Sequence, residues 1–241
     1  MLEEARKVPK PVELKGTLEY VQSPAETLPF LEDSSVDVII SAQAAHWFDW
    51  QKLWREAARV LRKDGTIAAW SFFPHNKGYS EFRLTKYPSA TPLINAYSQG
   101  NDPTDSIGPH WERPGRTILD DHLRQIPDPQ DVAPDQFHDF QRVFFRGDHH
   151  EYLPQDQSKP IILQKTVTWE GLLAYLHTFS AYHTYQQQHP EDSKNSDGDV
   201  AVRFWKKLVE HVAEQTGNKP VESTDEIQIE WPIALIVAKR S

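Results

Sequence analysis

The clearest pattern along the chain is an amphipathic helix between two short apolar runs. The runs Val36–Ser41 and Thr66–Phe72 are apolar almost throughout, which is typical of strands covered on both faces of a parallel sheet. Between them, positions 50–62 have the pattern of a helix with Leu, Trp and Ala along one face and charged residues along the opposite face. Asp49 is positioned to cap this helix and Lys63-Asp64-Gly65 to end it. Strand, helix and strand in this order predict a βαβ unit and therefore an α/β fold.

The rest of the chain predicts a loop-rich middle followed by two more helices. Six prolines between Gln99 and Pro134 are too many for long regular elements, so we expect only a short helix there, near 117–125. The final apolar stretch, Ile227–Lys239, predicts one or two strands with a bend or an edge position at Pro232. The other expected elements are a brief strand at Leu18–Gln22, a strand at Gln141–Arg146, and helices over Thr168–Tyr185 and Val200–Gln215.

Composition indicates a globular protein and argues against several classes. The 241 residues are 38% hydrophobic, with 8 Trp, 8 Tyr and 11 Phe, which is enough for one large domain or two small ones. The 26 basic and 35 acidic side chains give a net charge of −9 and no basic stripe, so we expect neither nucleic acid nor a membrane surface as a partner. We expect a cytoplasmic protein, because the charged start MLEEARK lacks a signal core and the longest apolar run is too short to span a bilayer.

Several catalytic classes are also disfavoured by residues that the chain lacks. Without cysteine there is neither a disulfide framework nor a thiol nucleophile. The pattern G-x-S-x-G of a serine nucleophile does not occur. We expect no metal centre, because the adjacent His149, His150 and Glu151 point in different directions and no further ligand has useful spacing.

The segment from Ala25 to Phe73 resembles the class I S-adenosylmethionine (SAM)-dependent methyltransferases. The likeness is carried by AETLPFLEDSSVDVIISAQAAHWFDWQKLWREAARVLRKDGTIAAW, and it is strongest to the small-molecule branch that includes the fungal trans-aconitate methyltransferase. Two further segments are similar to the same branch, from Trp169-Glu170-Gly171 to His183 and at Glu230-Trp231-Pro232. The resemblance implies a Rossmann-like sheet, SAM as the cofactor and an activity of the EC 2.1.1 type.

The same resemblance implies that part of the sheet is absent. In such enzymes a first strand, a glycine-rich loop and a second strand ending in an acidic residue precede this segment, and they hold the methionine and ribose parts of the cofactor. Here Met1–Arg6 looks like the helix that follows the second strand, and none of the ten glycines forms a G-x-G pair. We therefore expect an N-terminally truncated sheet that lacks its first βαβ portion, roughly 50 residues. Its remaining strands would present a bare edge.

Pattern and resemblance together predict three regions. Residues 1–75 form a partial Rossmann-like methyltransferase core. Residues 76–199 form an inserted lid of helices and loops, with one core strand near 141–146. Residues 200–241 return to the core with a helix and strands.

Candidate cofactor residues follow the first predicted strand, at the end where open α/β sheets bind ligands. The resemblance places Glu26 at an acidic turn near the adenine and Gln43, Ala44 and Trp47 beside the cofactor. His46 is a catalytic candidate that would orient a substrate carboxylate or shuttle a proton. Structural roles stay open for three of these: Glu26 as a solvent-facing turn residue, His46 as a satisfied loop histidine, and Trp47 as a packing residue.

The predicted helix over 168–185 supplies the candidates of the lid. Tyr182 and His183 are catalytic candidates that would hydrogen-bond a carboxylate or a carbonyl. Trp169 and Tyr175 are candidates for substrate binding. His183 also continues the apolar stripe of this helix, so a packing role stays open for it.

Two kinds of chemistry and one non-catalytic role fit this sequence. The first is O-methyl transfer from SAM to a small organic acid or a secondary-metabolite intermediate, and a carboxylate acceptor would need no general base. The second is a methyltransferase-like scaffold that works without SAM as a cyclase or pericyclase, by holding a reactive conformer. The third is a pseudoenzyme that binds a partner by strand addition at its bare edge. The acceptor and the oligomeric state stay open.

Overall fold

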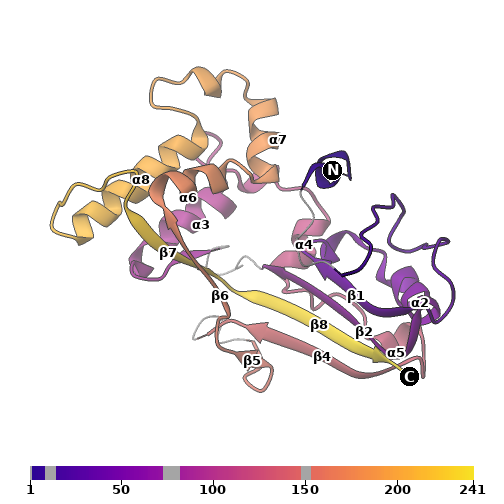
Figure 1. Cartoon of the computed structure of the whole chain (residues 1–241). Helices are drawn as coiled ribbons and strands as arrows, with labels where there is room; N and C mark the ends of the chain where they lie inside the picture. The colour runs from indigo at the N-terminus through magenta and orange to yellow at the C-terminus, as the bar shows by residue number, and fades with distance from the viewer. Residues whose placement is uncertain (1, 9–14, 73–81, 148–152) are drawn as a thin grey trace.

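The computed structural model describes residues 2–8, 15–72, 82–147 and 153–241, which form two sheets with helices packed around them (Figure 1). The patch at His149–Glu151, from which we expect no metal site, lies outside these ranges. No helix within them has the length and apolar character needed to cross a membrane.

The larger sheet confirms the expected mixed α/β, Rossmann-like fold. Its strand order is β1-β2-β8-β4-β5, and β1 pairs with β2 and β4 with β5 in parallel. Strand β8 is antiparallel to both of its neighbours, so four of the five strands share one direction. The strands are β1 (Val36–Ala42), β2 (Leu61–Phe72), β4 (Phe137–Phe145), β5 (Ser158–Lys159) and β8 (Ile233–Arg240).

Helix α2 (Trp50–Val60) covers one face of this sheet, as the sequence predicts. The Asp49 side chain accepts a hydrogen bond from the backbone N–H of Lys52 and caps the helix. Trp54 is fully buried and meets Phe137 edge-on, with ring centroids 5.1 Å apart. The contact therefore packs α2 against β4, which lies more than eighty residues later in the chain. The same core also contains Leu53, Ala57, Ile67, Ala69, Phe144, Ile236 and Ala238.

The residues Lys63-Asp64-Gly65, expected to end the helix, are instead an irregularity inside β2, because α2 already ends at Val60. The strand begins at Leu61, directly after α2, and pairs there with Val36. The register then shifts, so that the next pair joins Val38 to Thr66. Asp64 adopts a positive φ of 62°, which lets the extra residues loop out while the strand continues.

A second layer contains the smaller sheet and four of the described α-helices. Its strand order is β3-β7-β6, with β7 antiparallel to both neighbours. Tyr97 and Phe204 stack at the centre of this layer with ring centroids 4.2 Å apart. The elements are β3 (Arg83–Leu84), β6 (Leu163–Thr168), β7 (Glu226–Trp231), α3 (Thr91–Gln99), α6 (Trp169–Leu176), α7 (Ser180–Gln188) and α8 (Val200–Gln215). Helix α8 and strand β7 thus pack in this layer, although the sequence places them in the core region 200–241. The bounds of the three regions stay a prediction.

The predicted helix over 168–185 is two helices. Helix α6 ends at Leu176, and Phe179 has an extended backbone, with φ −67° and ψ 129°, before α7 begins at Ser180. The Thr178 hydroxyl donates to the Tyr175 carbonyl, an alternative to continuing the helix. After the break, α7 buries Ala181 and Tyr185 in the same core that contains Leu172 and Leu176 of α6.

Strands β7 and β8 lie in different sheets although only Pro232 separates them. In Figure 1 they follow one another, in yellow, from the helical layer into the middle of the larger sheet. The sequence predicts a bend or an edge position at Pro232, and in the structure this residue separates two strands that belong to different sheets. This junction connects the two layers through one short stretch of backbone.

The loop-rich middle and the N-terminal stretch have little regular structure. The short helix expected near 117–125 is α4 (Gly115–Asp120), which stops where His122 and Leu123 adopt positive φ. The strand expected at Leu18–Gln22 does not form: these residues pair with no strand in the described part of the chain, and most of them are exposed. The remaining short helices are α1 (Leu2–Lys7), α5 (Pro129–Val132) and the single turns η1 (Ala45–Trp47), η2 (Pro88–Ala90), η3 (Gly108–His110) and η4 (Asp192–Lys194).

Strand β1 forms one edge of the larger sheet. Within the described residues it pairs with β2 alone, and the side chains of Val38 and Ile40 are 51% and 63% exposed. Most strands of a parallel sheet are covered on both faces, so this edge is unusually open.

Candidate functional site

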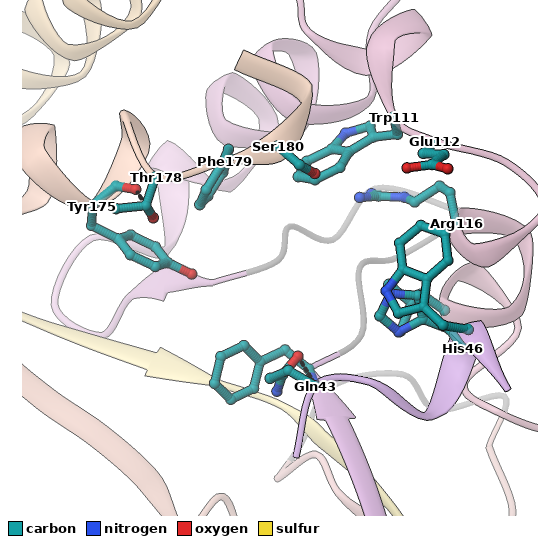
Figure 2. Close-up of a pocket in the computed structure, with 12 residues that line it drawn as sticks. Gln43, His46, Trp111, Glu112, Arg116, Tyr175, Thr178, Phe179 and Ser180 are labelled. Atoms are coloured by element: carbon teal, nitrogen blue, oxygen red, sulfur yellow. Dashed lines mark hydrogen bonds between the residues drawn. The ribbon is translucent and has the colours of Figure 1, made fainter. Parts of the chain in front are cut away.

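A cavity of about 490 Å³ lies where the larger sheet meets the helical layer. That volume lies within the range of small-molecule sites. Figure 2 shows its walls: Gln43 and His46 on one side, Trp111 and Arg116 above them, and Tyr175 and Phe179 across the cavity. The lining residues come from the carboxyl ends of β1 and β2, from the segment 111–119 and from the junction of α6 and α7: Gln43, His46, Trp47, Phe72, Trp111, Glu112, Arg116, Leu119, Tyr175, Thr178, Phe179 and Ser180.

Gln43 ties the two strand ends together at the floor of the cavity. Its backbone N–H donates to the Trp70 carbonyl at 2.8 Å, and its side-chain oxygen accepts from the Phe72 N–H at 3.2 Å. The residue has a positive φ of 59°, which a non-glycine residue rarely adopts. A strained backbone at the carboxyl end of a parallel strand is a frequent feature of ligand sites.

His46 and Trp47 follow on the single turn η1. Their rings are 4.7 Å apart, and the Trp47 side chain is 50% exposed. Burial of the His46 ring, with a smaller contribution from the positive charge of Arg116, lowers the pKa of His46 to about 4. Its Nδ1 atom is buried and has no hydrogen-bond partner among the described residues. At neutral pH this imidazole is therefore uncharged and has a nitrogen for which the described residues supply no partner.

Gly115 brings α4 against η1. A Cβ atom at this position would lie 2.9 Å from Cδ2 of His46 and 3.0 Å from Cζ3 of Trp47. Such distances are shorter than van der Waals contact, so only glycine fits here without displacing the two rings. The close approach of the two turns places Arg116, the next residue, at the cavity.

Arg116 is the basic side chain of the cavity wall. It is only 3% exposed, and its Nε donates to Oδ1 of Asp120 at 2.8 Å. Its guanidinium carbon lies 4.4 Å from the centre of the Trp111 ring, within the range of a cation–π contact. Figure 2 shows the guanidinium between Trp111 and His46. An arginine held in this way is suited to binding an anionic group of a ligand.

The opposite wall is built from the junction of α6 and α7 and from the end of β7. The Tyr175 hydroxyl accepts a hydrogen bond from Nε1 of Trp231 at 3.0 Å. Trp231 also stacks on Phe72, with ring centroids 5.8 Å apart. Phe179 meets Tyr175 edge-on at 5.0 Å. This wall is therefore largely aromatic, and its polar groups come from Tyr175, Thr178 and Ser180.

The structure brings some of the sequence candidates together at this cavity. Gln43, His46, Trp47 and Tyr175 all line it. Ala44 lies just before η1, where its carbonyl accepts from the Trp47 N–H at 3.0 Å. The assigned roles of these residues stay predictions.

Two other candidates have structural partners away from the cavity lining. The Glu26 carboxylate accepts from the Asp49 N–H at 2.8 Å, at the start of α2. Trp169 is 1% exposed and packs against Trp205, whose Nε1 donates to the Trp169 carbonyl. The apolar surroundings of the indole therefore place Trp169 in the core of the helical layer.

Tyr182 and His183 lie on α7, beyond the cavity lining. The Tyr182 hydroxyl donates to Oδ2 of Asp199 at 3.0 Å, and burial with the charge of Asp199 raises the pKa of Tyr182 to about 12. Asp199 also caps α8, because its side chain accepts from the N–H groups of Ala201 and Val202. The His183 side chain is exposed. The break between α6 and α7 is the physical reason why these two residues do not continue the wall formed by Tyr175.

Sequence reasoning did not identify Trp111, Arg116 or Phe179 as site residues. Trp111 and Arg116 lie in the proline-rich middle, where no periodic pattern marks a functional face. The available signal was the spacing of Trp111 and Arg116 around Pro114 and Gly115, which indicates a tight turn that carries an aromatic and a basic side chain.

Comparisons with known proteins point to methyltransferases. A family profile described as a methyltransferase domain matches residues 1–69. The Saccharomyces cerevisiae protein CRG1, assigned as a SAM-dependent methyltransferase, is 24% identical over 236 residues, a match that covers 96% of this chain and 72% of CRG1. A Dictyostelium discoideum protein assigned as a methyltransferase is 24% identical over 228 residues, with 95% of this chain and 68% of that protein covered.

A solved structure shows the same fold. A protein from Anaeromyxobacter dehalogenans assigned as a type II methyltransferase superposes with a TM-score of 0.60 and 19% identity, over 98% of this chain and 76% of its own. The solved structure shows the fold, and the sequence matches show a similarity to methyltransferases, of which CRG1 is one assigned as SAM-dependent. The trans-aconitate branch and the truncation of the sheet stay predictions.

Proposed function

We propose that this protein transfers a methyl group from SAM to a carboxylate oxygen of a small organic acid, of the kind found among secondary-metabolite intermediates. The observation that carries the proposal is the buried Arg116 in a cavity at the carboxyl ends of β1 and β2. That end of an open α/β sheet is where ligands bind, and an arginine there is suited to hold an acid in place.

The residues of the cavity fit the methyl-donating end of SAM. Gln43 has a strained backbone directly after β1, and Nδ1 of His46 is buried without a partner among the described residues, so a bound ligand could satisfy it. SAM supplies a methyl group on a positively charged sulfur, and its transfer to a carboxylate oxygen forms a C–O bond as the C–S bond breaks and leaves S-adenosylhomocysteine. The glycine-rich loop that would hold the rest of the cofactor has no counterpart in this sequence.

The chain's own residues would act mainly by positioning the acceptor. A carboxylate needs no general base, so a neutral His46 serves as a hydrogen-bonding partner rather than as a base. Arg116 would hold the carboxylate, while Trp111, Tyr175 and Phe179 exclude water from the reacting atoms. The matches to methyltransferases favour this transfer over the cyclase and pseudoenzyme alternatives. A cytoplasmic location stays a prediction from the sequence.

Calorimetric titration of SAM and S-adenosylhomocysteine into the 241-residue chain tests the cofactor. We expect binding at about micromolar strength, ~8 kcal/mol. A panel of carboxylic acids with methyl-labelled SAM then tests the transfer. The labelled product should lose its methyl group on mild alkaline treatment, as a methyl ester does. A folded protein that binds neither SAM nor S-adenosylhomocysteine, or a product stable to alkali, would overturn the proposal.

A further inference from the structure

The charges lining the cavity are few and unevenly placed. Among the described residues that line it, Arg116 is the one basic side chain that stays charged at neutral pH, and Glu112 the one carboxylate. His46 is neutral there, because its pKa is about 4. Five of the twelve lining residues are aromatic besides this histidine: Trp47, Phe72, Trp111, Tyr175 and Phe179.

Arg116 has one fixed orientation. The ion pair with Asp120 uses the Nε donor, and the face of the guanidinium rests on the Trp111 ring. A guanidinium carries a single positive charge, so it cannot also balance a second or third carboxylate of the same ligand. Among the described residues of the lining, such a carboxylate would meet Glu112, aromatic rings or the uncharged polar side chains of Gln43, Thr178 and Ser180. None of these balances its charge, and burial of a charge without a partner is strongly unfavourable.

The aromatic walls favour a flat apolar body. Phe179 and Tyr175 meet edge-on, and Phe72 stacks on Trp231 behind them, so these rings support one another. Flat unsaturated groups pack well on such faces and edges. The hydroxyl of Tyr175 is one of the polar groups of this wall, with those of Thr178 and Ser180, and it lies at the side of the cavity far from Arg116.

From these observations we infer that the acceptor is a monocarboxylate with a flat aromatic or conjugated body, and not a small polycarboxylate of the aconitate type. The carboxylate lies at Arg116 and the body lies between Trp111 and the wall formed by Tyr175 and Phe179. This inference rests on the proposed function, since it names the substrate class for the same cavity.

Binding measured without SAM separates the inference from the methyl transfer. Quenching of the intrinsic tryptophan fluorescence, to which Trp47 and Trp111 of the cavity contribute, would report the binding of three probes, checked by calorimetry. The probes are cinnamate, trans-aconitate and cinnamyl alcohol. We expect cinnamate to bind about tenfold or more tightly than either of the others. Cinnamyl alcohol has the same flat body without the charge, and trans-aconitate has three carboxyl groups without the aromatic ring.

Two variants and a control assign the effect to residues. Arg116→Gln should weaken cinnamate binding by about tenfold or more and change cinnamyl alcohol binding by less than about twofold. Phe179→Leu should weaken both of these ligands. The control is Arg124→Gln, since Arg124 pairs with Asp121 nearby but does not line the cavity, and it should change neither. Thermal melting establishes that each variant is folded, and Arg116→Lys replaces Arg116→Gln if the latter does not fold.

The outcomes distinguish the two proposals. Tight cinnamate binding that depends on Arg116 supports the inference, even if no methyl transfer is found. Methylation of trans-aconitate together with weak cinnamate binding leaves the proposed function in place and overturns the inference. Equal binding of cinnamate and cinnamyl alcohol, or binding of no probe, also overturns it.

Discussion

The guanidinium of Arg116 lies beside the imidazole of His46, and its charge adds to the effect of burial in lowering the pKa of His46 to about 4. The same arginine rests on Trp111 and pairs with Asp120. A basic group and a neutral histidine therefore share one cavity wall, and each affects how the other can interact with a ligand.

Removing the charge of Arg116 should change the pKa of His46. In the Arg116→Gln variant, loss of the nearby charge should raise the pKa of His46 towards the ordinary value of 6.5, while burial keeps it below that value. NMR titration of the histidine ring protons measures it directly, and Arg124→Gln is the matched control. A His46 pKa that is unchanged in Arg116→Gln would contradict the placement of the two side chains.

The lowered pKa of His46 also predicts how the free energy of unfolding changes with pH. The folded state takes up the proton of His46 only near pH 4, whereas the unfolded chain takes it up near 6.5. Between these values the unfolded state binds more protons, so the contribution of His46 to stability falls as the pH is lowered. We expect the acid dependence of the unfolding free energy to weaken in His46→Gln, as measured by urea titrations from pH 4 to 7. An unchanged dependence would show that His46 is not buried as described.

Gly115→Ala should disturb the site while leaving the fold intact. The new methyl group would meet His46 and Trp47 at about 3 Å and displace both rings by a few tenths of an ångström. Misplacement near reacting groups is costly, so we expect turnover to fall about tenfold or more. Gly16→Ala is the control, since nothing lies within 4 Å of its added methyl group. Equal turnover in the two variants would show that the contact is unimportant.

Tyr182→Phe tests whether Tyr182 acts in catalysis or in structure. The variant loses the hydrogen bond to Asp199, so we expect a loss of about 1–2 kcal/mol in the free energy of unfolding. If the role is structural, kcat should stay within about threefold of the wild type under conditions where both proteins are folded. A loss of kcat of about a hundredfold with little change in stability would instead support the catalytic role predicted from the sequence.

Arg59 should be important for the loop that precedes β1. Its two terminal nitrogens donate to the carbonyls of Leu31 and Leu28 at 3.0 Å each, and it pairs with Glu56, whose pKa it lowers. Lysine has one terminal nitrogen and cannot reproduce the hydrogen bonds that the two nitrogens of arginine make. Arg59→Lys should therefore cost about 1–3 kcal/mol of unfolding free energy in denaturant titrations. Arg55→Lys, at an exposed position of the same helix, is the control. The prediction fails if the two variants are equally stable.

The sequence predicts the local elements near β1 and α2 well because their determinants are local. The apolar stripe and the Asp49 cap define the start of α2, and the apolar runs define β1 and β2. The break between α6 and α7 could not be predicted in the same way, because Thr168–Tyr185 has a continuous helical pattern and the interruption depends on the packing of Phe179.

The cavity was only partly predictable, for a different reason. Gln43, His46 and Trp47 follow a strand end, so their position indicates a ligand site. Arg116 is buried at the cavity only because α4 approaches η1 at Gly115. Contacts between segments about seventy residues apart leave no periodic pattern in one sequence, and the same is true of the bond between Trp231 and Tyr175.

The short connection at Pro232 has a mechanical consequence. Trp231 touches both Phe72 on the sheet and Tyr175 on the helical layer, and the next residue but one already belongs to the central strand β8. Rotation of one layer against the other would have to break these two contacts of Trp231. Trp231 therefore resists widening of the cavity, and we expect ligands to be selected by whether they fit a preformed gap rather than by closure around them.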